Sequence, residues 1–182
     1  MSTIATVVVN EPTDERVVQR IAEALRANGQ YAKQIRDFAD MLEDNQHPLG
    51  LKFQPKPGQL LVCRFGLGFQ QPEMVKTRPV LVVSPHQRRW TGLCLVVPIS
   101  SVPPDPVEPY HYRLPDGLLP SKKYPEAWIK GDLVITVGKH RLDRIKTGFR
   151  QYEAPLVPPE VLREARRCIL HATGMHTLTA HL

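Results

Sequence analysis

Short apolar runs bounded by turn residues fill the chain from about residue 59 to residue 145, whereas the first 50 residues repeat apolar positions at helical spacing. Runs such as 79–84 and 93–100 are rich in Val, Leu and Ile and lie between Pro, Gly and Ser, which is typical of buried strands. Many short strands with tight turns favour a small closed β-barrel over a parallel sheet. We expect strands at 59–65, 79–84, 93–100, 109–114, 127–130 and 132–137.

Helices are predicted on both sides of this β region. Residues 13–45 carry apolar residues at helical spacing after the N-cap candidate Thr13, and Asn28-Gly29 interrupts them, which predicts a helical hairpin or a kinked helix. Pro158-Pro159 opens a second helix, which we expect to run through Ala172 and to stop by Gly174. The side chains expected to face the core from this helix are Val161, Leu162, Ala165, Cys168, Ile169 and Ala172.

The pattern divides the chain into three parts. Residues 1–50 are an acidic helical extension, residues 55–174 are a β-barrel domain with its C-terminal helix, and residues 175–182 are a tail. The Pro- and Gly-containing stretch around residues 47–58 is the expected linker. The predicted fold class is therefore mainly β with flanking helices.

Charge is distributed unevenly between these parts. Residues 1–50 hold five Lys/Arg against eight Asp/Glu, a net charge of −3, and the remainder holds 19 against 10, a net charge of +9. A basic domain joined to an acidic segment favours a polyanionic ligand for the basic part, and RNA or DNA is the natural candidate.

Cysteine and histidine usage argues against disulfides and metal sites. Cys63, Cys94 and Cys168 are odd in number and far apart, so we expect reduced thiols, as in the cytoplasm. The tail histidines are spaced by five residues, which is not a zinc-binding pattern, and no metal or cofactor is expected. No run of about 18 apolar residues occurs, so no membrane-spanning helix is predicted.

Two strand ends carry the most informative chemistry. Lys76-Thr77-Arg78-Pro79 opens one apolar run, and Pro98-Ile99-Ser100-Ser101 closes the next. If the two runs pair antiparallel through the polar loop between them, Arg78 and Ser100 share one rim of the sheet. The residue before a proline is held in extended geometry, which partly fixes the direction of Arg78. A fixed guanidinium beside a hydroxyl is suited to holding a phosphate.

The order and spacing of several blocks resemble the PemK/MazF family of toxins from type II toxin–antitoxin systems. The resemblance covers about residues 55–174 and implies an SH3-like β-barrel with a C-terminal helix, commonly a homodimer. The blocks that carry it are Pro57-Gly58-Gln59-Leu60-Leu61-Val62, Lys76–Pro85, Leu95–Ser101, Trp128-Ile129-Lys130-Gly131-Asp132-Leu133, Gly138–Ile145 and Pro158–Arg163.

The resemblance also implies roles for individual residues. Arg78 falls at the family's main catalytic arginine, which binds the scissile phosphate, and Ser100 falls where the family usually has threonine. Asp132 and Lys130 match a pair that some members use as base and acid, with arginine at the position of Lys130. We expect both to lie on one strand, two residues apart and on one face. The histidines nearest these blocks, His86, His111 and His140, match no catalytic position.

Further RNA contacts are expected around this rim. Lys76, Ser101 and Arg141 lie within the matching blocks, and Glu73 lies in the loop before them. Aromatic side chains are the usual platforms for splayed bases of single-stranded RNA. Among the candidates Trp90, Tyr110, Tyr112 and Trp128, we expect Trp128 in the core and favour Tyr110 and Tyr112 as platforms.

The implied activity is sequence-specific, metal-independent cleavage of single-stranded RNA, such as messenger RNA, by attack of the ribose 2′-hydroxyl. The implied partner is an acidic antitoxin that covers the basic groove. Two other functions stay open at this point: a gyrase poison of the CcdB type, which shares the barrel, and a non-catalytic barrel that binds nucleic acid or protein. The acidic residues 1–50 could cover the groove in cis, extend a dimer interface or recruit a partner.

Overall fold

The computed structural model describes Gln19, Glu23 and residues 50–65, 74, 76–89, 91–120 and 126–182. The chain divides into two units, residues 1–47 and residues 48–182. The helices expected over 13–45 lie outside the described residues, apart from Gln19 and Glu23, which are both helical. All further description concerns the second unit.

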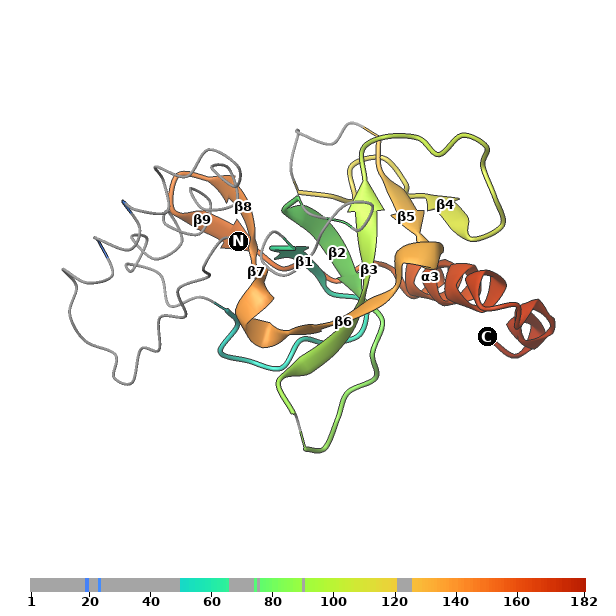
Figure 1. Ribbon diagram of the computed structural model, residues 1–182, viewed down its shortest axis with the longest axis horizontal. Coiled ribbons are helices and arrows are strands. Elements are labelled where there is room, and N and C mark those ends of the chain that lie inside the picture. Colours follow the sequence, from blue (N-terminus) through green and yellow to red (C-terminus); the bar gives the residue numbers. More distant parts are fainter. Residues whose placement is uncertain are drawn as a thin grey trace, which may run out of the picture. The chain divides into compact units, whose positions relative to one another are not determined.

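Antiparallel strands form the body of this unit, which confirms the mainly β fold (Figure 1). The seven-stranded sheet has the order β4-β5-β3-β2-β1-β7, and β6 also pairs with β3. A separate two-stranded sheet contains β8 and β9. The strands are β1 (Leu60–Cys63), β2 (Arg78–Val82), β3 (Leu93–Ser100), β4 (His111–Arg113), β5 (Trp128–Lys130), β6 (Ile135–Gly138), β7 (Leu142–Asp143), β8 (Ile145–Gly148) and β9 (Gln151–Glu153).

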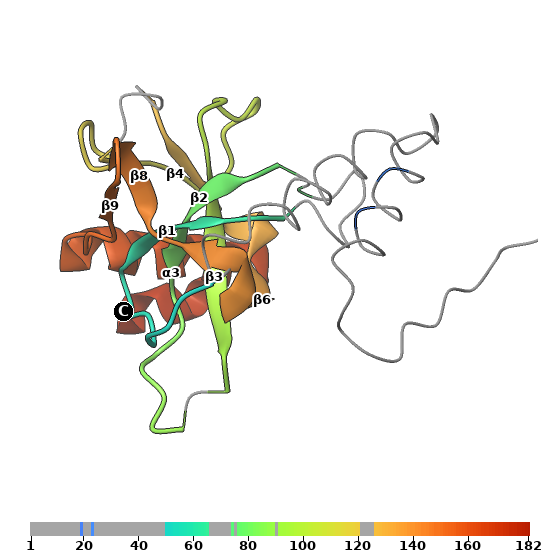
Figure 2. The ribbon, with the colours of Figure 1, turned by 90° about the vertical axis from the view of Figure 1, so that its left-hand side faces the viewer.

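The long strand β3 organises the sheet because both of its edges are paired. One edge pairs with β2, and the other pairs first with β6, at Leu93 to Val96, and then with β5, at Ile99 and Ser100. This change of partner lets the sheet bend around β3. Figure 1 shows β4 and β5 on one side of β3, above the C-terminal helix, and the β8–β9 hairpin on the other side of the domain. The helix also lies below β4 in the perpendicular view of Figure 2.

Both faces of the central strands β1, β2 and β3 are largely buried, which explains why these strands are almost continuously apolar instead of alternating. One face carries Leu60, Leu81, Val97, Ile99 and Ile129 in a cluster with the C-terminal helix. The other face carries a second cluster. Burial of each Val, Leu or Ile side chain stabilises the folded state by about 1.5–3 kcal/mol. The register of the central strands is therefore strongly fixed. The second cluster contains Leu51, Leu61, Cys63, Phe65, Val80, Val82, Cys94, Val96, Val137 and Leu142.

The C-terminal helix α3 (Pro159–Ala172) has the predicted bounds. Pro159 stands in its first turn, where proline is tolerated because the missing N–H has no intrahelical partner. Val161, Ala165 and Cys168 are buried against the sheet, and Leu162 and Ile169 are partly buried. The expectation for Ala172 was wrong: this last helical residue is exposed. The tail continues as a 3₁₀ helix, η3 (His176–His181).

The strand predictions failed in two places. The strand expected at 132–137 begins only at Ile135, because the 3₁₀ helix η1 (Gly131–Leu133) occupies its first residues. The strands β7, β8 and β9, between Leu142 and Glu153, were missed because Lys, Arg, Thr and Gln interrupt the apolar pattern there. A second 3₁₀ helix, η2 (Lys139–Arg141), links β6 to β7.

Candidate functional site

The register between β2 and β3 brings the two predicted strand ends together. Leu81 pairs with Val97 and Val80 pairs with Pro98, which confirms the antiparallel arrangement expected from the sequence. Continuing this register by two residues places Arg78 opposite Ser100, where β2 begins and β3 ends. Residues opposite each other in an antiparallel sheet point to the same face. Arg78 and Ser100 therefore occupy one rim and one face of the sheet.

Arg78 is held by the strand and yet has an unused hydrogen-bond donor. Its Cα is paired with that of Cys63 on β1, and its side chain is partly buried. The Nε atom is buried and has no hydrogen-bond partner among the described residues. Leaving a buried polar donor unsatisfied costs about 1–3 kcal/mol, more for a charged group. An anion that accepts from this guanidinium would remove that cost.

Ser100 occupies the strand position opposite Arg78 when the β2–β3 register is continued. The residue is only 5% exposed, and its Oγ accepts the Val102 N–H at 3.1 Å. That bond uses one lone pair, so the hydroxyl hydrogen can still be donated to a ligand oxygen. The neighbouring Ser101 is exposed. Since successive residues of a strand point to opposite faces, Ser101 is the less suitable partner for Arg78.

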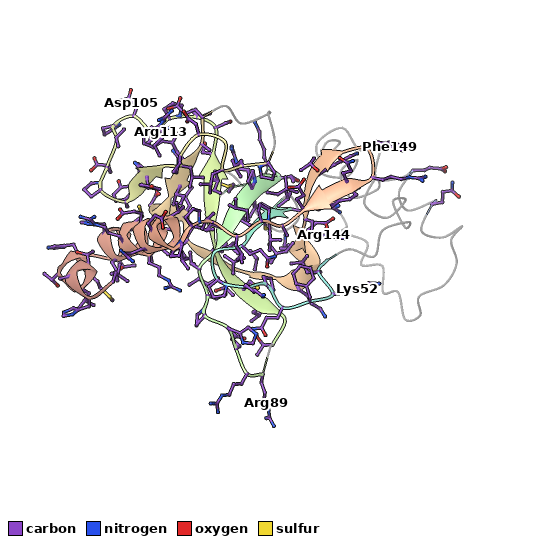
Figure 3. The ribbon with its side chains drawn as sticks, turned by 180° about the vertical axis from the view of Figure 1, so that it is seen from behind. Lys52, Arg89, Asp105, Arg113, Arg144 and Phe149 are labelled. Atoms are coloured by element: carbon purple, nitrogen blue, oxygen red, sulfur yellow. The ribbon has the colours of Figure 1, made fainter. Side chains whose placement is uncertain are left out.

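The same face continues across β5 and β4. Ser100 pairs with Trp128, which pairs in turn with Arg113, and Lys130 pairs with His111. Figure 3 shows Arg113 at one end of the domain and Arg89, in the loop between β2 and β3, at the opposite end. The rim with Arg78 and Ser100 is the one at the Arg113 end, because the β2–β3 loop leaves the sheet at the other end.

Trp128 and Tyr112 are both partly buried, but they lie on opposite faces of the sheet. Trp128 is partly exposed on the face of Ser100, although the sequence suggested a core position. Tyr112 lies on the opposite face, packed against the core, and burial raises the pKa of its hydroxyl, with the carboxylates Glu164 and Glu160 of α3 adding to the effect. Tyr110 is partly buried and its ring stands edge-on to His111, 4.6 Å between centroids.

Asp132 is not on the strand that was expected to carry it. It lies in η1, so the prediction that Lys130 and Asp132 share one strand face was wrong. Because Ser100 pairs with Trp128, the residues after Lys130 lie toward the other end of β3 from the rim. The Asp132 carboxylate instead lies 3.7 Å from His111 Nε2.

His111 links Asp132 to the loop before β4. Its Nδ1 accepts the Glu108 N–H at 3.0 Å, so in the neutral ring the proton is on Nε2, which faces Asp132. Burial lowers the pKa of His111 and the positive charge of Lys130 lowers it further, while Asp132 and Glu108 act in the opposite direction. The sequence suggested no role for His111, and its position in the alternating His111-Tyr112-Arg113 strand is the signal that was overlooked.

The lowered pKa of His111 predicts weaker folding in acid. Because the folded-state pKa lies below the ordinary value of 6.5, the unfolded chain binds more protons as pH falls below that value. We expect His111→Asn, which removes this titration, to flatten the fall in unfolding free energy between about pH 7 and pH 5. Urea unfolding of both proteins across this pH range measures the change. Identical slopes of unfolding free energy against pH would contradict a lowered pKa of His111.

The remaining predicted contacts are distributed along and beyond the rim. Lys76 is exposed two residues before Arg78, and Glu73 lies outside the described residues. Arg141, at the end of η2, donates from Nη1 to the Arg64 carbonyl oxygen at 3.3 Å. Its charge also counters the effect of burial, which raises the pKa of the Cys63 thiol to about 12. Arg141 therefore stands beside β1, on the far side of that strand from Arg78.

In the part of the chain that the structure describes, no group of three or more His, Cys, Asp or Glu side chains is placed to hold a metal ion. None of the helices in this part combines the length and the apolar character that a membrane span requires.

Comparison with known proteins agrees with this arrangement. The family model for the PemK-like, MazF-like toxin of type II toxin–antitoxin systems matches residues 56–172. The uncharacterized protein YifN of Escherichia coli (strain K12) is 27% identical over 150 residues, covering 71% of this chain and 99% of YifN. MazF from Deinococcus radiodurans has a similar structure, with a TM-score of 0.50 and 23% identity over 68% of this chain and 100% of that one.

A second structure from the same organism, of MazE–MazF, gives a TM-score of 0.48 and 24% identity, covering 68% of this chain and 99% of that one. The family match spans the whole described barrel from the turn before β1 to the end of α3, including the rim with Arg78 and Ser100. This chain belongs to the PemK-like, MazF-like toxin family of type II toxin–antitoxin systems.

Proposed function

We propose that this toxin is a metal-independent endoribonuclease that cleaves single-stranded RNA at a short sequence. The observation that carries the proposal is the unpartnered, buried Arg78 Nε at the rim position opposite the Ser100 hydroxyl. The net charge of +9 on residues 51–182 supports a polyanionic substrate. The acidic antitoxin of the system would compete for the same basic surface, and a homodimer would extend it.

The proposed reaction uses a nucleophile that the substrate itself provides. The ribose 2′-oxygen attacks the adjacent phosphorus, the bond to the 5′-oxygen breaks, and the products carry a 2′,3′-cyclic phosphate and a 5′-hydroxyl. The 2′-hydroxyl loses a proton and the leaving oxygen gains one, so no hydrolytic water is consumed in this step. The protein then has to position the phosphate, stabilise its growing negative charge and move protons.

Arg78 and Ser100 would bind the phosphate together. The guanidinium stabilises charge on the non-bridging oxygens through directed N–H bonds, and the Ser100 hydroxyl donates one more. Threonine is usual in the family where this chain has Ser100, and its methyl group would stiffen the side chain. Burial of Ser100 between β2 and β5 supplies part of that restraint here.

We expect Asp132→Asn to slow cleavage by about tenfold or less, a smaller loss than the 10²–10⁴-fold typical of a direct general base. The reason is its position toward the other end of β3, beside His111. Its charge would act on Lys130, which shares the face of Ser100. Single-turnover rates on one RNA measure this, and a loss beyond about 10²-fold would place Asp132 directly at the phosphate.

Incubating the purified protein with a long RNA in the presence of a chelator tests the function. Fragments ending in 2′,3′-cyclic phosphate and 5′-hydroxyl are expected. Fragments with 5′-phosphate ends, or loss of cleavage on chelation, would contradict the mechanism. Intact RNA with salt-dependent binding would indicate a binding barrel instead, and intact RNA with inhibited gyrase would indicate a CcdB-type poison.

A further inference from the structure

Trp128 occupies the position next to the phosphate-binding pair. It is the strand partner of Ser100 on one side and of Arg113 on the other, so its indole lies on the face that carries Arg78. The side chain is partly exposed, in contrast to its buried neighbour Ile129, which points to the opposite core. Part of the indole surface therefore remains exposed beside the rim.

A chain of polar contacts fixes the orientation of this indole. Its Nε1 donates to Glu126 Oε1 at 3.2 Å, and Arg113 Nε donates to the same oxygen at 3.3 Å. Arg113 in turn donates from Nη2 to Asp116 Oδ1 at 3.0 Å. The indole itself makes one of these contacts, and Arg113 holds the Glu126 carboxylate that accepts from it. The Glu126 contact therefore favours one orientation of the ring before any ligand binds.

We propose that Trp128 is the platform on which a base next to the scissile phosphate stacks, and that Glu126 is the positioning residue that sets its plane. This inference rests on the proposed RNA-cleaving function. A flat aromatic face accepts any base. The bases that flank a phosphate in RNA lie within one or two times the distance between adjacent β-strands from it. An unpaired Glu126 would repel the RNA backbone, but its carboxylate lies 3.3 Å from the Arg113 guanidinium, which also pairs with Asp116. The Arg113 pairing therefore reduces the repulsion between Glu126 and the RNA backbone.

RNA binding can be measured on this indole directly. The chain has two tryptophans, Trp90 and Trp128, so a Trp90→Phe background leaves Trp128 as the only indole reporter. The probe is a mixed-sequence single-stranded RNA with 2′-O-methyl groups, which cannot undergo the proposed attack. We expect saturable quenching of Trp128 fluorescence on titration, weakening as salt is raised.

Variants separate the platform from its support. Trp128→Ala should weaken binding of this RNA by about 5- to 100-fold, as expected for loss of one stacked base, whereas Trp128→Phe should retain most of the affinity. Glu126→Ala should weaken it less, and Glu126→Gln, whose amide oxygen can still accept from the indole, should restore it. With cleavable RNA these changes should appear mainly in KM, because stacking is present in ground and transition states alike.

Phe53→Ala is the matched aromatic control. Phe53 is 41% exposed and follows Lys52, which Figure 3 shows well away from the end where Arg113 lies. It should leave RNA affinity unchanged. Circular dichroism and urea unfolding of each variant exclude a folding defect as the cause of weaker binding.

Three outcomes would overturn the inference: absence of quenching by an RNA that the protein binds, equal RNA affinity of Trp128→Ala and Phe53→Ala, or cleavage that is insensitive to Trp128→Ala. Quenching without any cleavage of unmodified RNA would remove the proposed nuclease activity and leave the stacking platform in place. Cleavage that is insensitive to Trp128→Ala would keep the proposed nuclease activity and remove the stacking platform.

Discussion

Replacing Arg78 with alanine is expected to slow RNA cleavage by about 10²–10³-fold, the usual cost of losing one preorganised donor to a developing negative charge. The fold should persist, because the Arg78 Nε has no hydrogen-bond partner among the described residues. Removing the side chain therefore leaves no described polar group without a partner that Nε had supplied. Single-turnover cleavage of one RNA and urea unfolding of the same samples measure both effects.

Arg89→Ala provides the matched control for this prediction. It removes the same charge from an exposed position in the β2–β3 loop, at the opposite end of the domain from Arg113 (Figure 3). The rate should stay within about threefold of the unmodified protein, since long-range surface charge is largely screened at physiological salt. Equal rates for Arg78→Ala and Arg89→Ala would remove Arg78 from the mechanism.

Ser100→Ala extends the test to the second member of the pair. If both side chains bind one phosphate, their contributions to the cleavage rate are not independent. The fold-reduction in rate of the double variant should then be smaller than the product of the two single fold-reductions. Strict multiplicativity would show that the two side chains act on different parts of the RNA.

Local sequence signals were sufficient wherever strand and helix ends coincide with turn residues. Strand β3 (Leu93–Ser100) and helix α3 (Pro159–Ala172) have the predicted bounds, because Gly92 and Pro158-Pro159 mark their starts. The β2–β3 pairing followed from the length of the loop between two apolar runs. These features depend on residues close together in the chain, and they locate the Arg78–Ser100 rim.

Long-range packing decided the features that the sequence did not indicate. Residues 127–137 read as almost continuous strand, but η1 interrupts them where α3 approaches Gly131. The positions of Trp128 and Tyr112 depend on which face of each short strand meets the core. Both strands alternate in polarity, with Tyr112 between His111 and Arg113 and Ile129 between Trp128 and Lys130. Read together, these alternations point Tyr112 and Ile129 inward.

Gly131→Ala is expected to lower the free energy of unfolding by about 1–3 kcal/mol, the typical cost of overpacking. A Cβ atom at this position would lie 2.7 Å from the Cys168 carbonyl carbon and 2.9 Å from its oxygen, so α3 and η1 would have to separate. The smaller entropy of the unfolded alanine chain, worth about 0.4–1 kcal/mol, offsets only part of this cost.

Two companion variants make the Gly131 prediction specific. Leu133→Ala changes an exposed residue of the same 3₁₀ helix and should alter stability by no more than about 0.5 kcal/mol. Cys168→Ala should fail to rescue Gly131→Ala, because alanine keeps the Cβ and the backbone atoms that the new methyl group meets. Urea unfolding midpoints measure all three. Full stability of Gly131→Ala, or rescue by Cys168→Ala, would show that α3 does not press on η1 through its backbone.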